Sequence, residues 1–483
     1  MATAFGLIIV GAGPAGMAAA IAAAGRGIDT LLLDEQDQAG GQYYRALPAG
    51  VNGSPRRDPH HLAGDALRAR LYAGPAKVAL QRKVWHIRLD AAPGGPATFT
   101  LQTLGANGNE IWTSRALIVA SGTTERVIPF AGWTTPGVMG LAGASILLKA
   151  HQMLPGGRTV VAGSGPLLAL VAAGIIAGGG TVAAVVDLAG TADWLRALPG
   201  LATRPALLRQ GVSWLLRLKR AGVPIFTRHT VVNARGRDGV ESVDIQPVDA
   251  QRRIQGQTAP RTLTADSLVI GHGLTPAGEL LRASGVTFIP RPDAGGWVPD
   301  CDDYMRTSVP GLFAAGDCAG VAGAETALLR GRLAGLAASA LLAGLPDDQL
   351  AALTAATRRE LRQAARFSGA SAALMAMPAG LADSVAPEVV VCRCEGVTLA
   401  QIDSALDAGA SELNQLKIWS GCAMGSCQGR FCAEMLEHRL RRRALAPRVA
   451  GPLRARPPAR PLSVSALLGE DDGAPLILPE KRP

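Results

Sequence analysis

Five of the chain's seven cysteines fall within one short span. Cys392 and Cys394 form C-x-C, and two C-x4-C pairs follow, Cys422 with Cys427 and Cys427 with Cys432. Four thiolates ligate an iron–sulfur cluster, whereas structural zinc sites mostly use close C-x-x-C pairs, which this span lacks. The pattern therefore favours an iron–sulfur site over zinc. Spacing alone leaves open whether Cys422 or Cys432 is a ligand.

A glycine-rich motif follows the first apolar run, FGLIIV. Its first glycine permits a tight turn, the second lets the backbone approach a pyrophosphate, and the third allows a helix to pack closely on a strand. An acid 18 residues further on, at the end of the next apolar run, can accept hydrogen bonds from ribose hydroxyls. The motif predicts a dinucleotide site formed by Gly11, Gly13, Pro14, Ala15, Gly16 and Asp34, with Glu35 as the neighbouring acid.

A second nucleotide motif, AGSGPLLAL, begins at Ala162. Gly163, Gly165 and Asp187 are its candidate contacts, but Leu168 replaces the third glycine and keeps the helix away from its strand. Asp187 would repel a 2′-phosphate, which argues against NADP. We therefore expect a nucleotide-type fold here that is not a working NADH site. The histidines are scattered, and we interpret His272 as a loop hydrogen-bonder rather than a base.

The elements that must position these motifs are strands alternating with helices, which predicts an α/β fold. Two nucleotide-type units are expected, with a late strand (308–320) that returns to the first unit. The expected parts are a discontinuous first nucleotide-binding domain (1–125 and 285–345), a second nucleotide-binding-like domain (126–284), a helical linker (346–388), an iron–sulfur domain (389–445) and an extended basic tail rich in Pro and Arg (446–483).

Composition and charge argue against a nucleic-acid-binding protein, a membrane-spanning protein and a secreted protein. The chain has 483 residues, is 48% hydrophobic and carries a net charge of +10. Its basic segment 438–461 has no interleaved aromatic residues, so we expect a solvated tail or a docking surface for an acidic partner rather than a nucleic-acid site. The uncharged run 159–186 is long enough to span a bilayer, but its glycines favour a buried βαβ unit. Clustered cysteines and no secretion signal predict a reducing, cytoplasmic location.

Three further motifs resemble the glutathione-reductase-like flavoproteins over residues 1–345. These are GGQYYR (40–45), ASGTTER (120–126) and LFAAGDCAG (312–320). The resemblance implies FAD as the bound cofactor, with Asp317 on the ribityl chain. The disulfide reductases of that architecture are disfavoured, because Cys301 and Cys318 are isolated thiols. The implied additional contacts are Gly41, Gln42, Arg45, Ser121, Gly122, Gly316 and Asp317.

The segment CRCEGVT…CQGRFC resembles the 2Fe–2S domain of bacterioferritin-associated ferredoxin. The resemblance implies that Cys392, Cys394, Cys427 and Cys432 are the ligands and that Cys422 is a nearby non-ligand. The sequence departs from the family pattern at Ala423, where glycine is usual.

Taken in order, these motifs resemble the FAD-binding subunit of heteromeric opine oxidase, hydrogen cyanide synthase and D-hydroxyproline dehydrogenase. The resemblance implies an electron-transfer subunit of a dye-linked amine or amino-acid dehydrogenase. It implies a D-amino-acid-oxidase-like partner that contains FAD, FMN at the interface with that partner, and a small ferredoxin-like subunit. It also allows peripheral association with the cytoplasmic face of the inner membrane. The alternative is a self-sufficient NADH-dependent reductase with FAD and an iron–sulfur cluster.

Overall fold

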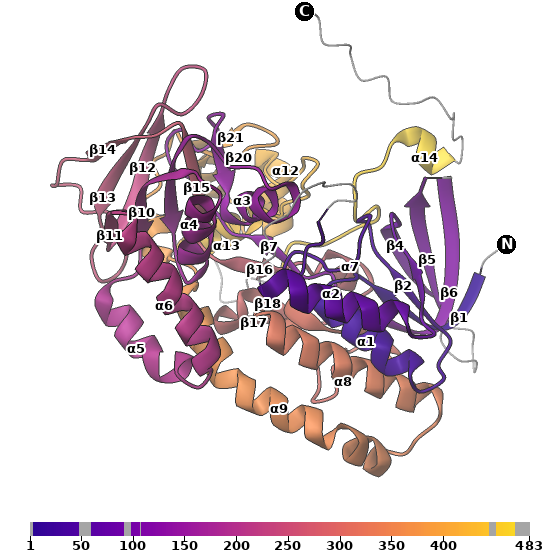
Figure 1. Cartoon of the computed structure of the whole chain (residues 1–483). Helices are drawn as coiled ribbons and strands as arrows, with labels where there is room; N and C mark the ends of the chain where they lie inside the picture. The colour runs from indigo at the N-terminus through magenta and orange to yellow at the C-terminus, as the bar shows by residue number, and fades with distance from the viewer. Residues whose placement is uncertain (1–2, 48–58, 91–97, 107, 444–450, 469–483) are drawn as a thin grey trace, which may run out of the picture.

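The computed structural model describes residues 3–47, 59–90, 98–106, 108–443 and 451–468 (Figure 1). In this part of the chain, the first sheet has the strand order β3-β2-β1-β6-β5-β4, and β19 pairs with β6. Strands β1, β2, β3 and β19 run parallel to their neighbours, whereas β4 and β5 form an antiparallel meander with the first half of β6. The bounds are β1 (Thr3–Val10), β2 (Thr30–Leu33), β3 (Lys77–Ala79), β4 (Lys83–Asp90), β5 (Thr98–Gly105), β6 (Gly108–Val119) and β19 (Leu312–Ala314).

Helices cover the first sheet because its parallel strands are apolar on both faces. Helix α1 (Pro14–Ala24) follows the first glycine motif and packs against α8 (Ala324–Leu342), as Figure 1 shows. A Cβ on Gly331 of α8 would lie 2.0 Å from the main-chain oxygen of Ala15. The absence of a side chain therefore lets the two helices approach closely. Helix α2 (Pro59–Tyr72) also packs against α1.

The second sheet is parallel throughout, with the order β11-β10-β9-β15-β8. A three-stranded antiparallel sheet, β12-β13-β14, follows β11 in the chain. The strands are β8 (Val138–Gly140), β9 (Arg158–Gly163), β10 (Thr181–Asp187), β11 (Ile225–Thr227), β12 (His229–Arg235), β13 (Ser242–Pro247), β14 (Arg261–Thr264) and β15 (Ser267–Gly271). The helices of this region are α3 (Leu141–Ile146), the π-helix η1 (Leu147–His151), α4 (Leu167–Ala177), α5 (Thr191–Leu201) and α6 (Pro205–Arg220).

Short elements connect the two nucleotide-type units. Strands β7 (Thr123–Glu125) and β16 (Leu274–Pro276) pair antiparallel where the chain leaves the first unit and returns to it. Leu280 and Leu281 of α7 (Glu279–Ala283) pack in a core of the first sheet. The hairpin β17 (Phe288–Arg291) and β18 (Gly296–Pro299) follows, with the 3-10 turns η2 (Pro292–Ala294) and η3 (Gly316–Ala319).

The linker after α8 is mainly one long helix. Helix α9 (Asp347–Leu374) packs against both α8 and α5, and the short α10 (Ala379–Asp383) follows it. Beyond the linker, a two-stranded sheet and three helices share one buried core. Their bounds are β20 (Val390–Cys392), β21 (Val397–Thr398), α11 (Leu399–Asp407), α12 (Leu413–Ser420) and α13 (Ala433–Arg442). The structure thus confirms the α/β fold with two dinucleotide-binding units and a small helical C-terminal domain.

Residues 451–460, which we name the C-terminal strap, run without helix or strand from the cysteine-rich domain to the first sheet. The tail was expected to be extended, but Val464–Leu468 form a short helix, α14, whereas 444–450 and 469–483 lie outside the described residues. No helix in the described ranges combines the length and the apolar character needed to cross a bilayer.

Candidate functional site

The first glycine motif forms the turn between β1 and α1. Gly11 has φ +102°, and a Cβ there would lie 2.4 Å from the main-chain oxygen of Ala120. A Cβ on Gly16 would lie 1.7 Å from the main-chain oxygen of Gly11, so this glycine is needed for contact between helix and turn. Gly13 has no such obstruction and lies beside Gly41. The turn therefore leaves backbone N–H groups at the helix N-terminus open to a phosphate.

Asp34 follows directly after β2 and lies beside this turn. Its Oδ2 accepts a hydrogen bond from Ala12 N at 2.5 Å, and its Oδ1 accepts one from Gln36 N at 2.8 Å. Burial raises the pKa of Asp34 from its usual value, although both backbone hydrogen bonds oppose this. Each carboxylate oxygen keeps a second lone pair for ribose hydroxyls.

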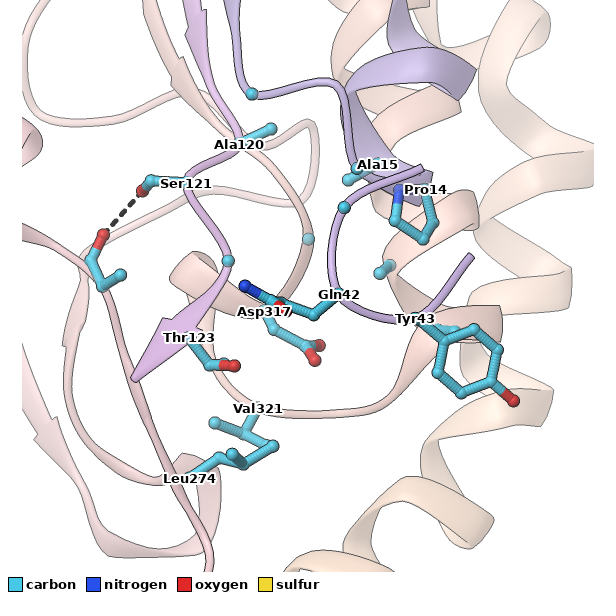
Figure 2. Close-up of a pocket in the computed structure, with 18 of the residues that line it drawn as sticks. Pro14, Ala15, Gln42, Tyr43, Ala120, Ser121, Thr123, Leu274, Asp317 and Val321 are labelled. Carbon is cyan, nitrogen blue, oxygen red and sulfur yellow. Dashed lines mark hydrogen bonds between the residues drawn. The ribbon is translucent and has the colours of Figure 1, made fainter. Parts of the chain in front are cut away.

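A cavity of about 390 Å³ opens over the turn and continues between Asp317, Gln42 and Thr123 (Figure 2). Ser121 donates to the main-chain oxygen of Ala277 at 2.6 Å, which fixes residues 120–126, named here the crossover segment, beside the cavity. The sequence-predicted residues that line the cavity are Gly11, Gly13, Pro14, Ala15, Asp34, Glu35, Gly41, Gln42, Arg45, Ser121, Gly122, Gly316 and Asp317. Gly16 is the one predicted contact of this set outside the lining, because it packs against the turn.

Asp317 lies deep in the cavity wall. Its Oδ1 accepts hydrogen bonds from the N–H groups of Ala322 and Gly323 at 3.0 and 3.2 Å, and burial raises its pKa. A glycine turn at a helix N-terminus and an acid placed for the ribose are the parts that a dinucleotide site requires, and the family resemblance implies Asp317 as the contact of the ribityl chain. The residues present therefore fit FAD.

The second glycine motif forms the same kind of turn as the first, but a side chain from another part of the chain covers it. Gly163 has φ +132°, and a Cβ there would lie 1.7 Å from the main-chain oxygen of Gly271, so strand and turn are in close contact. At Gly165, however, a Cβ would lie 2.5 Å from Cγ of Met375. The end of α9 thus places a side chain on the turn where a phosphate would bind.

The acid of the second motif is also engaged within the chain. Asp187 is 6% exposed and accepts hydrogen bonds from Trp194 Nε1 and from Ala189 N, both at 2.9 Å. Burial raises its pKa to about 6. Trp194 belongs to a small apolar cluster in which α5 packs against Phe367 and Leu374 of α9. The structure brings the predicted residues together, but α5 and α9 occupy the side that a nucleotide would approach.

His272 is a hydrogen-bond acceptor in the interior. Its Nδ1 lies 3.2 Å from Ile128 N, which donates to it, and its side chain is buried. Burial, followed by the charge of Arg126, lowers its pKa to about 3. A neutral imidazole with one nitrogen already used is a poor base at neutral pH, in agreement with the interpretation as a loop hydrogen-bonder.

All five clustered cysteines converge on one place. The sulfur atoms of Cys392, Cys422 and Cys432 are buried and lie within 4.8 Å of one another. The thiol of Cys427 hydrogen-bonds with that of Cys394, which is exposed at the surface. The buried thiols of Cys392, Cys422 and Cys432 thus form one group in which Cys432 interacts with both of the others, and the thiols of Cys394 and Cys427 lie beside each other. Five thiols in one place are enough to supply the four ligands of a 2Fe–2S cluster.

Two local features support cluster binding. A Cβ on Gly425 would lie 2.3 Å from Cβ of Cys394, so the loop between the last cysteines needs glycine at this position. A hydrogen bond with Cys432, followed by burial, raises the pKa of Cys392. The thiol therefore holds its proton until a metal replaces it. The ligand set with Cys432 rather than Cys422 stays a prediction, since both sulfurs lie close to Cys392.

Three residues near these sites were missed by the sequence analysis. Arg430 lines the nucleotide cavity and donates from Nη1 to the main-chain oxygen of Cys427 at 2.9 Å, so one side chain touches both cofactor sites. The motif CQGRFC contains Arg430, but nothing local indicates where it points. Met375 and Trp194 cover the second nucleotide motif through contacts between helices that no sequence motif marks.

Comparison with known proteins agrees with this geometry. The pyridine nucleotide-disulphide oxidoreductase family matches residues 5–341, and the BFD-like 2Fe-2S binding domain matches residues 390–442. The fold and the sites therefore define a flavoprotein oxidoreductase with FAD and an attached 2Fe–2S domain.

Similarity to known proteins identifies the family of flavoprotein oxidoreductases to which the chain belongs. The chain is 33% identical to a subunit of opine oxidase from Agrobacterium tumefaciens (strain Ach5), over 96% of this chain and 91% of that protein. It is 34% identical to the HcnB subunit of hydrogen cyanide synthase from Pseudomonas aeruginosa, over 95% of this chain and 97% of that protein. The chain belongs to the family that contains these two proteins.

Solved structures support the fold. A structure of L-proline dehydrogenase from P. horikoshii matches 96% of this chain and 79% of its own, with a TM-score of 0.68 and 19% identity. A thioredoxin reductase from Lactococcus lactis matches 71% of this chain and all of its own, with a TM-score of 0.51 and 20% identity. At these identities the likeness concerns the fold alone.

Proposed function

We propose that this chain is the electron-transfer subunit of a heteromeric, dye-linked amine or amino-acid dehydrogenase. A separate D-amino-acid-oxidase-like subunit with its own FAD oxidises the C–N bond of an opine, D-hydroxyproline or a similar substrate. This chain then receives the electrons and passes them through its cofactors to an external acceptor. The names of the relatives, which are subunits of opine oxidase and hydrogen cyanide synthase, support this assignment.

The observation that carries the proposal is the contact between the two cofactor sites. Arg430 lines the nucleotide cavity and hydrogen-bonds to the carbonyl of Cys427. Cys394, on the same cluster, is exposed and gives electrons a route to the surface. Exposed apolar side chains near the last cysteines, such as Trp419 (48% exposed) and Met424 (57% exposed), offer contact area for another protein.

The main experiment compares the isolated chain with the assembled complex. The chain is produced alone and with the oxidase-like subunit, and reduction of an artificial dye is measured with opines, D-hydroxyproline and glycine. We expect turnover only in the complex. A rate of roughly one per second or faster from the isolated chain would place substrate oxidation here and refute the proposal.

A variant within the complex separates relay from assembly. Cys394→Ser removes a proposed cluster ligand at the surface and leaves the nucleotide cavity intact. We expect substrate still to bleach the partner's flavin, whereas dye reduction falls strongly. Equal dye reduction by the variant and the unchanged complex would show that electrons do not pass through the cluster.

The finer expectations concern the assembled enzyme. FMN at the interface with the partner, and a small ferredoxin-like subunit, are implied by the family resemblance. Flavin extraction tests the first, and electrophoresis of the purified complex tests the second. We also propose a cytoplasmic location, with peripheral association at the inner membrane, which cell fractionation tests.

The alternative function is an NADH-dependent reductase that feeds the cluster through this chain's own FAD. The chain would need an open second nucleotide site for that role. Met375 on the Gly165 turn and Trp194 on Asp187 count against it.

A further inference from the structure

The C-terminal strap joins the cysteine-rich domain to the first sheet. Leu453, at its start, is buried in the core of the cysteine-rich domain. Near its end, Ala459 donates from its backbone N to the main-chain oxygen of Trp85 at 2.8 Å, and its side chain is 3% exposed in a core of the first sheet. Gln428 donates to the main-chain oxygen of Pro458 at 2.7 Å. The strap is therefore anchored at both ends.

The strap ends at the nucleotide cavity. Arg460 follows Ala459 and lines the cavity together with Asp34 and Glu35. Its Nε lies 3.4 Å from Glu35 Oε2, and the two side chains are 25% and 41% exposed. The guanidinium is thus next to the acids that end β2, where the fold places the adenosine half of a dinucleotide.

Arg430 reaches the same cavity from the cysteine loop. Its Nη2 donates to the main-chain oxygen of Ala459 at 2.9 Å, and its side chain is 12% exposed. Its Nε lies 3.2 Å from Glu279 Oε1 but has no well-aligned hydrogen bond among the described residues. A buried guanidinium N–H without an aligned acceptor is uncommon, because leaving it unpaired costs free energy.

Two further arginines line this part of the cavity, near the acids Asp34 and Glu35. These are Arg45 and Arg82, and Arg82 is paired with Glu110 at 2.6 Å. Nε of Arg45 is buried and has no hydrogen-bond partner in the part of the chain that the structure describes. The two phosphates of a dinucleotide can accept such N–H groups, and arginine presents them in a planar fork suited to phosphate oxygens.

We propose that Arg460 and Arg430 bind the adenosine diphosphate half of FAD, so that the C-terminal strap and the cysteine loop complete a site otherwise built by the first nucleotide unit. The inference rests on the proposed function in taking FAD as the occupant. It adds two binding residues that the glycine motif and the fold of the first unit do not supply.

The test measures FAD affinity of the full-length chain without any activity assay. The flavin-loaded protein is diluted, released FAD is measured by its fluorescence, and ADP is added as a competitor for the adenosine half. Arg460→Gln keeps the length of the side chain and removes its charge. Arg456→Gln is the matched control, because Arg456 lies on the same strap and is exposed.

We expect Arg460→Gln to weaken binding of both FAD and ADP about tenfold or more, the usual effect of losing one hydrogen bond to a charged group. Arg456→Gln should bind both like the unchanged chain. If Arg460→Gln also binds both like the unchanged chain, the strap only covers the cavity and the inference is wrong. If the flavin-free Arg460→Gln variant binds ADP as tightly as the flavin-free unchanged chain does, Arg460 does not contact the adenosine half and the inference is equally wrong.

The results that would contradict the proposed function differ from those that would contradict this inference. A chain that retains no flavin would contradict the FAD assignment itself, whatever the variants do. A chain that retains FAD and loses it in Arg460→Gln, but relays no electrons in the complex, would keep the inference and overturn the function. Arg430→Gln is measured for FAD affinity and for cluster absorbance together, because Arg430 contacts Cys427 as well.

Discussion

Arg126 and Glu434 form a two-bonded ion pair that joins the crossover segment to helix α13. Nε and Nη2 of Arg126 donate to Oε2 and Oε1 of Glu434 at 2.6 and 2.7 Å. The Arg126 side chain is 3% exposed, and it also donates to the main-chain oxygens of Met375 and Gly295 at 2.9 and 3.1 Å. One guanidinium therefore holds the linker and the cysteine-rich domain against the nucleotide-type units.

Glu434→Ala should destabilise the fold by about 3 kcal/mol, because it leaves the buried charge of Arg126 without its counter-ion. Urea unfolding measures the change. The control is Arg441→Ala, which breaks a pair between Arg441, 52% exposed, and Glu437 on the same helix. That exposed pair contributes less than about 1 kcal/mol. If the free energy of unfolding falls equally in the two variants, burial of Arg126 does not make its ion pair more important for stability than the exposed pair.

Cys432→Ser should abolish the iron–sulfur absorbance, whereas Cys422→Ser should retain it. The family resemblance implies Cys392, Cys394, Cys427 and Cys432 as the four ligands, which leaves Cys422 as a non-ligand thiol within 4.8 Å of Cys392 and Cys432. Visible spectra with iron and sulfide analysis check both variants. Absorbance that survives in Cys432→Ser and disappears in Cys422→Ser would reverse the ligand assignment, and zinc without iron would refute the cluster.

NADH should not reduce the flavin at a catalytically useful rate. The second turn carries the Met375 side chain, and Asp187 already accepts a hydrogen bond from Trp194. Anaerobic mixing with NADH, followed by flavin absorbance, measures the rate, and dithionite serves as the control for reducibility. Rapid bleaching by NADH would favour the alternative reductase function.

Stability should decline in mild acid because of His272. Its pKa is lowered to about 3 in the folded chain, against about 6.5 when unfolded, so the folded state binds fewer protons. The contribution of the neutral His272 to the free energy of unfolding is fully present above pH 6.5 and is lost as the pH falls toward 3. At pH 5.5, one unit below the unfolded pKa, the loss is about 1.4 kcal/mol. His272→Asn keeps a hydrogen-bond acceptor without this titration. Urea unfolding at pH 7.5 and 5.5 should therefore show a smaller loss in the variant, and an equal loss would contradict the prediction.

Two glycine substitutions in helices should have opposite effects. In Gly331→Ala the new Cβ would meet the main-chain oxygen of Ala15 at 2.0 Å, so α8 must move from α1, at a cost of about 1–3 kcal/mol. In Gly369→Ala, on the exposed side of α9, a Cβ meets nothing within 4 Å. Alanine there should stabilise the helix by about 1 kcal/mol. Thermal unfolding distinguishes the two, and similar shifts would refute close helix packing.

The sequence predicted those parts of the sites whose geometry is local. Gly11 lies in the turn after β1, Gly16 in the first turn of α1 and Asp34 directly after β2, and their spacing fixes their positions once these elements form. The approach of Met375 to Gly165 depends instead on how α9 packs across the second unit. Contacts of this kind arise from tertiary packing between distant segments, so periodicity and motif spacing could not predict them.

The C-terminal strap also has a consequence for the order of events during protein synthesis. A ribosome makes both sheets, α9 and the cysteine loop before it makes the strap, and domains fold in that order as they emerge. Until Ala459 reaches the backbone of Trp85, the Glu35 side of the cavity has no cover. We therefore expect the strap to close over this side only after the rest of the cavity has formed. A chain cut short after Arg443 would keep both sheets and all five clustered thiols, but this side of the cavity would stay open.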